Sequence, residues 1–293
     1  MSIELIIHAR ERQVGNFTVK RLLPFGLKRM VGPFIFVDEM GPHAISPHTE
    51  GDVLPHPHIG LSTVTYLFSG AMLHRDSSGS VQEIHPGDVN WMTAGSGIVH
   101  SERFPESVKK NGTLLHGLQT WVALPKDKED TAPTFEHVPK SILPTWESGS
   151  ISWNLILGNA FGKVAPVHVY SPLFYCHCVA LETTTLHLTA EFGDSPTLER
   201  AFYVVEGSIE TEGQIISKGT MVSFKPNEPI SLTLQNGTRG MWLGGETFPE
   251  KRFIWWNFVS SDEAKIEAGK ARWKAQAFPK IEGETEFIPL PEK

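Results

Sequence analysis

Cysteine, basic charge and long apolar runs are scarce in this 293-residue sequence. Only two cysteines occur, Cys176 and Cys178, so a disulfide framework is excluded and both thiols are expected to be reduced and partly buried. The net charge of −7 provides no basic face for direct nucleic-acid binding. No apolar run approaches the roughly eighteen residues that span a bilayer, and residues 1–5 do not resemble a signal peptide. We therefore expect a cytoplasmic protein without membrane contact.

Helical patterns are also scarce, and short β-prone runs separated by turns dominate the chain. Residues 62–68 and 89–93, for example, are rich in β-branched and aromatic residues and are followed by glycine-containing turns. Short strands with turns about every eight to twelve residues predict an all-β sandwich or barrel. The stretch 126–147 is rich in proline and charge and has no periodicity, so it is interpreted as a connection. We expect one domain at 1–130 and a second at 131–293.

Three histidines and one glutamate occur as two pairs with the same spacing: His56 with His58, and His100 with Glu102. Side chains two residues apart on a strand point to the same side, so each pair offers two ligand atoms to a common space. If the two strands are neighbours, three imidazoles and a carboxylate converge and form a metal site. The alternative is that all four are ordinary surface or core polar groups, which requires two such pairs beside turns by accident.

The second half of the sequence repeats the first. The segment YLFSG at 66–70 matches YVVEG at 203–207, and a hairpin and a glycine follow in both copies. Counting from these landmarks, the four candidate ligands correspond to residues that are poor ligands, namely Gly193, Ser195, Leu232 and Leu234. We therefore expect metal in the N-terminal copy alone. Beyond the repeat, residues 260–277 change to a helical period and predict an amphipathic helix capped by Ser260 or Ser261.

Other side chains are candidates for supporting roles. His116 lies on a predicted strand and could hydrogen-bond a metal ligand, whereas His74 and His85 adjoin hairpin turns and are expected to be solvated. Four apolar residues are candidates for lining the metal cavity, with plain core packing as the alternative: Phe36, Trp91, Met92 and Trp121.

The strings HPHIGLSTVTYLFSG, HPGDVNWMTAGSGIVHSE and VGPFIFVDEMGP, with the duplication and the C-terminal helix, resemble the pirin family of the cupin superfamily. This resemblance covers nearly the whole chain. It implies a bicupin, two facing β-barrels of which the N-terminal one holds a single metal, commonly iron. It assigns the ligand roles to His56, His58, His100 and Glu102. Many pirins have Glu where this chain has Ser62, so the rim of the pocket is expected to differ.

The chemistry of the four ligands agrees with this assignment. Three neutral imidazoles and one carboxylate leave a net charge of +1 at a divalent ion, and a six-coordinate metal keeps two positions for water, O₂ or substrate. No cysteine belongs to the set, which argues against a thiolate-bound structural zinc. Fe(II) is our first candidate, and Zn, Mn, Ni and Cu are alternatives because affinity alone does not set occupancy.

Two functions follow from the resemblance. In the first, the protein is a quercetin 2,3-dioxygenase that cleaves a flavonol-like aromatic substrate, with Glu102 as the candidate base for the substrate hydroxyl. A carboxylate that is both ligand and base must loosen during turnover. In the second, the protein is a non-enzymatic, metal- and redox-sensing regulator that binds a transcription factor or a metabolic enzyme. Such a regulator would act through protein contact, since the chain is acidic.

Overall fold

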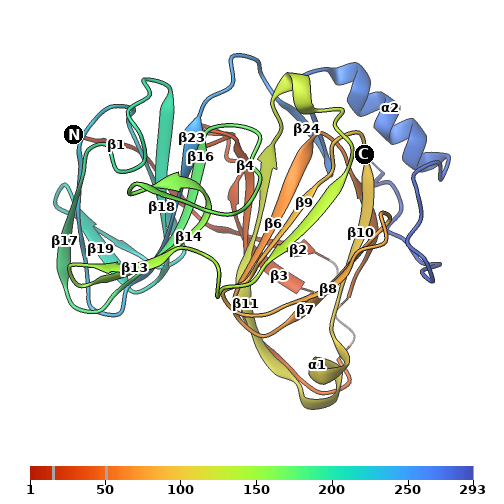
Figure 1. The fold of residues 1–293 in the computed structure, drawn as a ribbon, viewed down its shortest axis with the longest axis horizontal. Helices are drawn as coiled ribbons and strands as arrows, with labels where there is room; N and C mark the ends of the chain where they lie inside the picture. Colours follow the sequence, from red (N-terminus) through yellow and green to blue (C-terminus); the bar gives the residue numbers. More distant parts are fainter. Residues whose placement is uncertain (15–16, 50–51, 293) are drawn as a thin grey trace. The chain divides into compact units, whose positions relative to one another are not determined.

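The computed structural model describes residues 1–14, 17–49 and 52–292. Within these residues the chain is mostly β-strand, with two α-helices and one short 3-10 helix, and it forms two compact units (Figure 1). The predicted all-β architecture of two barrels with a short C-terminal helix is confirmed. Neither α-helix in the described part is long and apolar enough to cross a membrane.

One unit, which we call the histidine barrel, comprises residues 11–19, 37–140 and 249–293. Its larger sheet has the strand order β12-β9-β6-β11-β4-β3-β2, and its smaller sheet has the order β5-β10-β7-β8. The bounds of the larger sheet are β2 Arg10–Val14, β3 Phe17–Leu23, β4 Phe34–Ile45, β6 Leu61–Ser69, β9 Val89–Thr93, β11 Thr113–Ala123 and β12 Thr134–Val138. The bounds of the smaller sheet are β5 Val53–His58, β7 Met72–Asp76, β8 Val81–Ile84 and β10 Ile98–Arg103.

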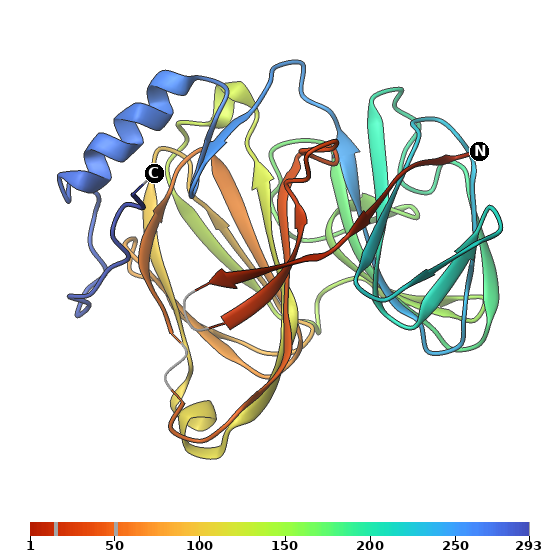
Figure 2. The ribbon, with the colours of Figure 1, turned by 180° about the vertical axis from the view of Figure 1, so that it is seen from behind.

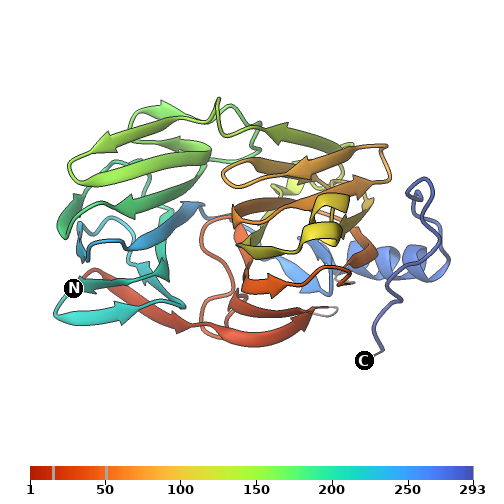
Figure 3. The same cartoon turned by 90° about the horizontal axis from the view of Figure 1, so that it is seen from below.

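Short helices and a hairpin complete the histidine barrel. Helix α1 (Glu106–Asn111) connects β10 to β11 (Figure 3), and the 3-10 helix η1 (Lys126–Lys128) follows β11. Strands β24 (Phe253–Trp255) and β25 (Phe258–Ser260) form a separate hairpin, which helix α2 (Glu263–Lys274) contacts.

The other unit, which we call the C-terminal barrel, comprises residues 1–10, 20–36 and 141–248. Its sheets have the orders β1-β21-β18-β23-β16-β14-β13, with β15 beside β14, and β17-β22-β19-β20. The bounds are β1 Ile3–His8, β13 Thr145–Ser148, β14 Ile151–Ala160, β15 Lys163–Val164, β16 Leu173–Ala180, β17 Thr184–Leu188, β18 Leu198–Glu206, β19 Ser208–Thr211, β20 Gln214–Ser217, β21 Thr220–Phe224, β22 Ile230–Leu234 and β23 Arg239–Glu246. Cys176 and Cys178 lie on β16 and are free, as predicted, but they are fully rather than partly buried.

The units do not follow the expected boundaries at 130 and 131. Strand β1 pairs antiparallel with β21, with Ile6 opposite Val222, and therefore belongs to the C-terminal barrel (Figure 2). The tail from residue 249 belongs instead to the histidine barrel, because Ile266 and Trp273 of α2 pack with Ile59 in one apolar cluster. Burial of apolar faces, rather than order along the chain, decides which barrel each terminal segment joins.

The C-terminal helix is shorter than predicted and has a different cap. Asp262 is the N-cap residue, and its Oδ1 accepts a hydrogen bond of 2.9 Å from the Ala264 amide. Ser260, which we had considered as the cap, lies at the end of β25 and donates its hydroxyl to Glu129 instead. The sequence pattern therefore located the helix correctly but placed its N-cap one or two residues too early.

Candidate metal centre

The three histidines come together because β5 and β10 are antiparallel neighbours. His100 lies directly opposite His56 in the register, and His58 lies opposite Ile98. His56 and His58 share a face of β5 because they are two residues apart. Pro57, which stands between them, lacks an amide hydrogen and is tolerated because β5 is the edge strand of its sheet.

The imidazoles form a compact buried cluster. One ring nitrogen from each of His56, His58 and His100 lies within 4.8 Å of the other two. The Nε2 atoms of His58 and His100 are 3.1 Å apart, and the ring centroids are separated by 4.4 to 5.1 Å. All three side chains are buried. Three ring nitrogens held this close form a set of donors that suits one cation.

Two backbone carbonyls orient the rings of β5. The carbonyl of Leu54 lies 2.8 Å from His56 Nδ1, and the carbonyl of Asn257 lies 3.2 Å from His58 Nδ1. A carbonyl only accepts hydrogen bonds, so each Nδ1 carries the proton and each Nε2 keeps a lone pair for a metal. His100 Nδ1 is buried and has no hydrogen-bond partner among the described residues. These features fit a metal bound through ring nitrogens.

The electrostatics also favour metal binding. Burial lowers the pKa of His56 to about 4, although its bond to the Leu54 carbonyl opposes this change. Burial, and then the proximity of the other imidazoles, lowers the pKa of His58 and of His100 well below the ordinary 6.5. All three rings are therefore neutral at pH 7, which is the state that binds metal.

Glu102 lies next to this cluster but is not one of its members. Both residues lie on β10, where an irregularity in the pairing with β5 separates His100 from Glu102, and Glu102 lies opposite His74 of β7. In the described part of the chain, the group of ligand atoms within 4.8 Å of one another contains the three imidazoles and not this carboxylate. Burial raises the pKa of Glu102 to about 7, and no described residue forms a hydrogen bond or an ion pair with its carboxyl group. A nearby cation would stabilise the ionised form of such a carboxyl group. The role of Glu102 as a fourth ligand stays a prediction.

His74 is a member of the site that the sequence reasoning missed. It is buried, its ring centroid is 5.4 Å from that of His100, and it stacks on Phe135 at 4.3 Å. Its Nε2 lies 2.9 Å from Asp76 Oδ2. Burial opposes ionisation of Asp76, but bonds from His74 and from Ser78 hold the pKa of Asp76 at about 2. The prediction that His74 is solvated is wrong, because β7 is an inner strand of its sheet and alternate residues face inward.

The other candidates divide between the site and the core. Trp121 does line the site, with its ring centroid 5.1 Å from that of His58. His116 does not reach the imidazoles: its Nε2 lies 2.8 Å from Glu39 Oε1, and five residues of strand, roughly 16 Å, separate it from Trp121. His85 is exposed, as predicted. The remaining lining candidates are buried: Phe36, Trp91 and Met92.

Two further positions bear on the comparison between barrels. Ser62, where many pirins carry Glu, is buried and its hydroxyl lies 3.0 Å from Thr93 Oγ1. In the C-terminal barrel, Leu232 and Leu234 are members of the apolar core, with Phe192 stacked on Phe174 at 4.1 Å. Aromatic and aliphatic side chains thus occupy the interior of that barrel.

Comparisons with known proteins agree with the fold and the site. Residues 16–122 match the family model described as Pirin, and residues 183–279 match the model described as Pirin C-terminal cupin domain. A pirin-like protein of Caulobacter vibrioides is 48% identical over 295 residues, covering 99% of this chain and 100% of that protein. Pirin-1 of Arabidopsis thaliana is 31% identical over 220 residues, covering 72% of this chain and 73% of that protein.

A solved structure is also similar along nearly the full length. The quercetin 2,3-dioxygenase of Acinetobacter baumannii has a TM-score of 0.89 and 32% identity to this chain, and the match covers 99% of this chain and 95% of that one. The two matched domains, the level of identity and the coverage lead to one conclusion: the chain belongs to the pirin family of the cupin superfamily.

Proposed function

We propose that this chain is a metal-dependent dioxygenase of the quercetin 2,3-dioxygenase type, acting on a flavonol-like substrate with Fe(II) as its metal. The observation that carries the proposal is the buried cluster of three neutral imidazoles with ring nitrogens within 4.8 Å. The similarity to a quercetin 2,3-dioxygenase structure over nearly the whole chain supports the reaction type. We propose His56, His58, His100 and Glu102 as the ligands.

When bound, a divalent metal in such a ligand set supplies open positions for O₂ and for the substrate oxygens, and it acidifies a coordinated hydroxyl. The protein residues prepare this site. The carbonyls of Leu54 and Asn257 hold the rings of His56 and His58 in the orientation that presents Nε2. The indole of Trp121, beside His58, provides an apolar wall that excludes water on that side.

Glu102 is the proposed acceptor for the proton of the substrate hydroxyl. Its pKa of about 7 in the metal-free protein matches a group that gains and loses a proton near neutral pH. A ligand that also accepts a proton must weaken its bond to the metal. The neighbouring pair of His74 and Asp76 is a second group of titratable side chains close to the site, and it lies on the strand that faces Glu102.

The test is anaerobic reconstitution with Fe(II), followed by addition of quercetin and then of air, while the flavonol absorbance band is recorded. We expect the band to decay in the wild-type protein and in His85→Ala, a control that alters an exposed histidine. We expect no decay in His58→Ala. If stoichiometric metal binds but the band persists with every first-row divalent metal, the proposal fails for this substrate, and the regulatory alternative gains support.

A further inference from the structure

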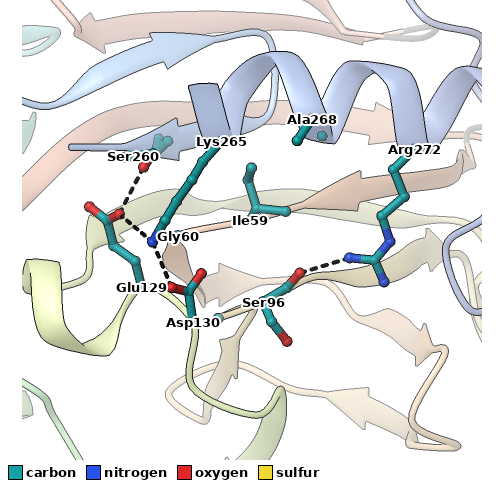
Figure 4. A pocket seen from close by; sticks show the side chains of 12 residues that line it. Ile59, Gly60, Ser96, Glu129, Asp130, Ser260, Lys265, Ala268 and Arg272 are labelled. Atoms are coloured by element: carbon teal, nitrogen blue, oxygen red, sulfur yellow. Dashed lines mark hydrogen bonds and ion pairs between the residues drawn. The ribbon is translucent and has the colours of Figure 1, made fainter. Parts of the chain in front are cut away.

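A pocket lies between helix α2 and the loops of the histidine barrel (Figure 4). We call it the α2 pocket, and its volume is about 170 Å³. The helix contributes one face, with residues spaced by three and four positions: Lys265, Ala268, Gly269 and Arg272. The barrel contributes the opposite wall: Ile59, Gly60, Gly95, Ser96, Glu129, Asp130, Val259 and Ser260.

The middle of the α2 pocket is apolar and has the size of one ring. Ile59 and Val259 of the barrel wall are buried. Ala268 lies on the helix, opposite Ile59 (Figure 4). A protein cavity of about 150 Å³ lined by apolar side chains binds benzene. The α2 pocket therefore has room for one six-membered ring.

The two ends of the α2 pocket carry cations of different character. At one end, Lys265 Nζ lies 2.6 Å from Asp130 Oδ2 and 3.4 Å from Glu129 Oε2, so two carboxylates compensate its charge. At the other end, the guanidinium of Arg272 donates to the Ser96 carbonyl at 2.8 Å. In the part of the chain that the structure describes, no carboxylate forms an ion pair with Arg272. The two carboxylates of the lining are therefore both at the Lys265 end, and the cation that they leave uncompensated is Arg272.

The guanidinium of Arg272 is also held in place. Its Cζ lies 4.0 Å from the ring centroid of Phe278, which fixes the plane of the group. One Nη is used by Ser96, and the other N–H groups form no hydrogen bond within the described residues. A planar guanidinium with free N–H groups is the preferred partner of a carboxylate, which it binds through two parallel hydrogen bonds.

We propose that the α2 pocket binds a small aromatic monocarboxylate of about the size of benzoate. The carboxylate bonds to Arg272, and the ring lies between Ile59 and Ala268. This site is separate from the imidazole cluster, because Ile59 packs with Phe258 and Ile266 on the helix side while His58 faces His100. The proposal does not depend on the reaction that the imidazole cluster supports.

The site nevertheless adjoins the metal centre through the backbone. Ile59 directly follows His58, and its carbonyl accepts a hydrogen bond of 3.2 Å from the Val259 amide. The same hairpin supplies the Asn257 carbonyl that accepts from His58 Nδ1. The hydrogen bond that orients His58 joins it to Asn257. An occupant of the α2 pocket contacts Ile59, one residue after His58, and Val259, two residues after Asn257.

Calorimetric titration of the metal-loaded full chain with sodium benzoate tests the proposal. We expect saturable binding, and binding weaker by roughly tenfold or more in Arg272→Gln, because a charge-assisted hydrogen bond is lost. Ala268→Leu fills the pocket from an exposed helix position with little change in helix propensity, and it should abolish binding. Lys274→Gln removes an exposed charge from the same helical turn and should leave the affinity unchanged. Near-UV circular dichroism confirms that each variant is folded.

Benzamide, which has the same ring without the charge, should bind at least roughly tenfold more weakly than benzoate. Equal affinity for the two molecules would overturn the assignment of an anionic ligand. Benzoate binding that is unchanged in both Arg272→Gln and Ala268→Leu would locate the ligand elsewhere, including at the metal, and would overturn the site. Absence of binding up to the solubility of benzoate would overturn the proposal as a whole.

Discussion

Replacement of Glu102 by Gln is expected to stabilise the metal-free protein while it weakens metal binding. Burial raises the pKa of this carboxyl from 4.5 to about 7 in the folded chain. A carboxyl whose folded pKa lies above its unfolded pKa favours folding when protonated, and it opposes folding increasingly as the pH rises between the two values. At 1.36 kcal/mol per pKa unit, the ionised carboxylate destabilises the metal-free protein by about 3 kcal/mol at pH 8 and by about 1 kcal/mol at pH 5. Gln mimics the protonated acid and removes this dependence.

Urea unfolding of the chelator-treated protein at pH 5 and pH 8 provides the measurement. The difference in unfolding free energy between Glu102→Gln and wild type should grow by about 2 kcal/mol between these two pH values. Comparison with wild type cancels the separate contribution of the imidazoles, which are the same in both proteins. Glu106→Gln is the matched control, since the Glu106 side chain is 92% exposed, and it should show no such growth. A Glu102→Gln variant that is less stable than wild type at pH 8 would refute the reasoning.

Three further predictions concern the metal centre and the helix. His58→Ala should lose stoichiometric metal and retain a β-rich far-UV spectrum, whereas His85→Ala should retain the metal; equal metal content in both by elemental analysis would contradict the ligand assignment. Below pH 7, the metal affinity of the wild type should fall about tenfold per pH unit as a proton competes for Glu102. The metal affinity of Glu102→Gln should not change between pH 5.5 and 7, because the imidazoles are neutral there. If metal titrations give parallel pH profiles for the two proteins, protonation of Glu102 is not the cause of the pH dependence. Asp262→Ala removes the N-cap hydrogen bond to Ala264 and should lower the free energy of unfolding by about 1 kcal/mol. Urea unfolding measures this change, and an unchanged free energy would show that the cap does not stabilise the protein.

Local spacing was sufficient to predict the core of the site. The period of two along a strand placed His56 and His58 on one face, and β5 and β10 proved to be neighbours. The same period could have identified His74, because Met72, His74 and Asp76 alternate with partly exposed residues on β7. We instead predicted that His74 is solvated, because it lies near a hairpin turn. An inner strand of a sheet buries its side chains close to a turn as well.

Contacts between distant segments could not be predicted from spacing. The carbonyl that orients His58 belongs to Asn257, about two hundred residues later in the chain, and any residue type supplies a backbone carbonyl. Trp256, just before it, has a positive φ of 50°, a conformation that is strained for a bulky residue and that no sequence pattern here indicates. The assignment of β1 and α2 to their barrels could not be predicted either, because apolar segments of similar composition can pack against either barrel.

The two barrels differ in the free energy that their interiors contribute to folding, and the difference bears on the candidate metal centre. In the C-terminal barrel, Leu232 and Leu234 stand where counting places His100 and Glu102, and burying each leucine stabilises the fold by about 2 kcal/mol. In the histidine barrel, the corresponding interior holds desolvated imidazoles and a carboxylate with a raised pKa, which oppose folding. A divalent cation that binds the folded state alone would offset this penalty. The free energy of unfolding of the histidine barrel should therefore rise with the logarithm of the metal concentration. The leucine-lined interior of the C-terminal barrel carries no such penalty for a metal to offset.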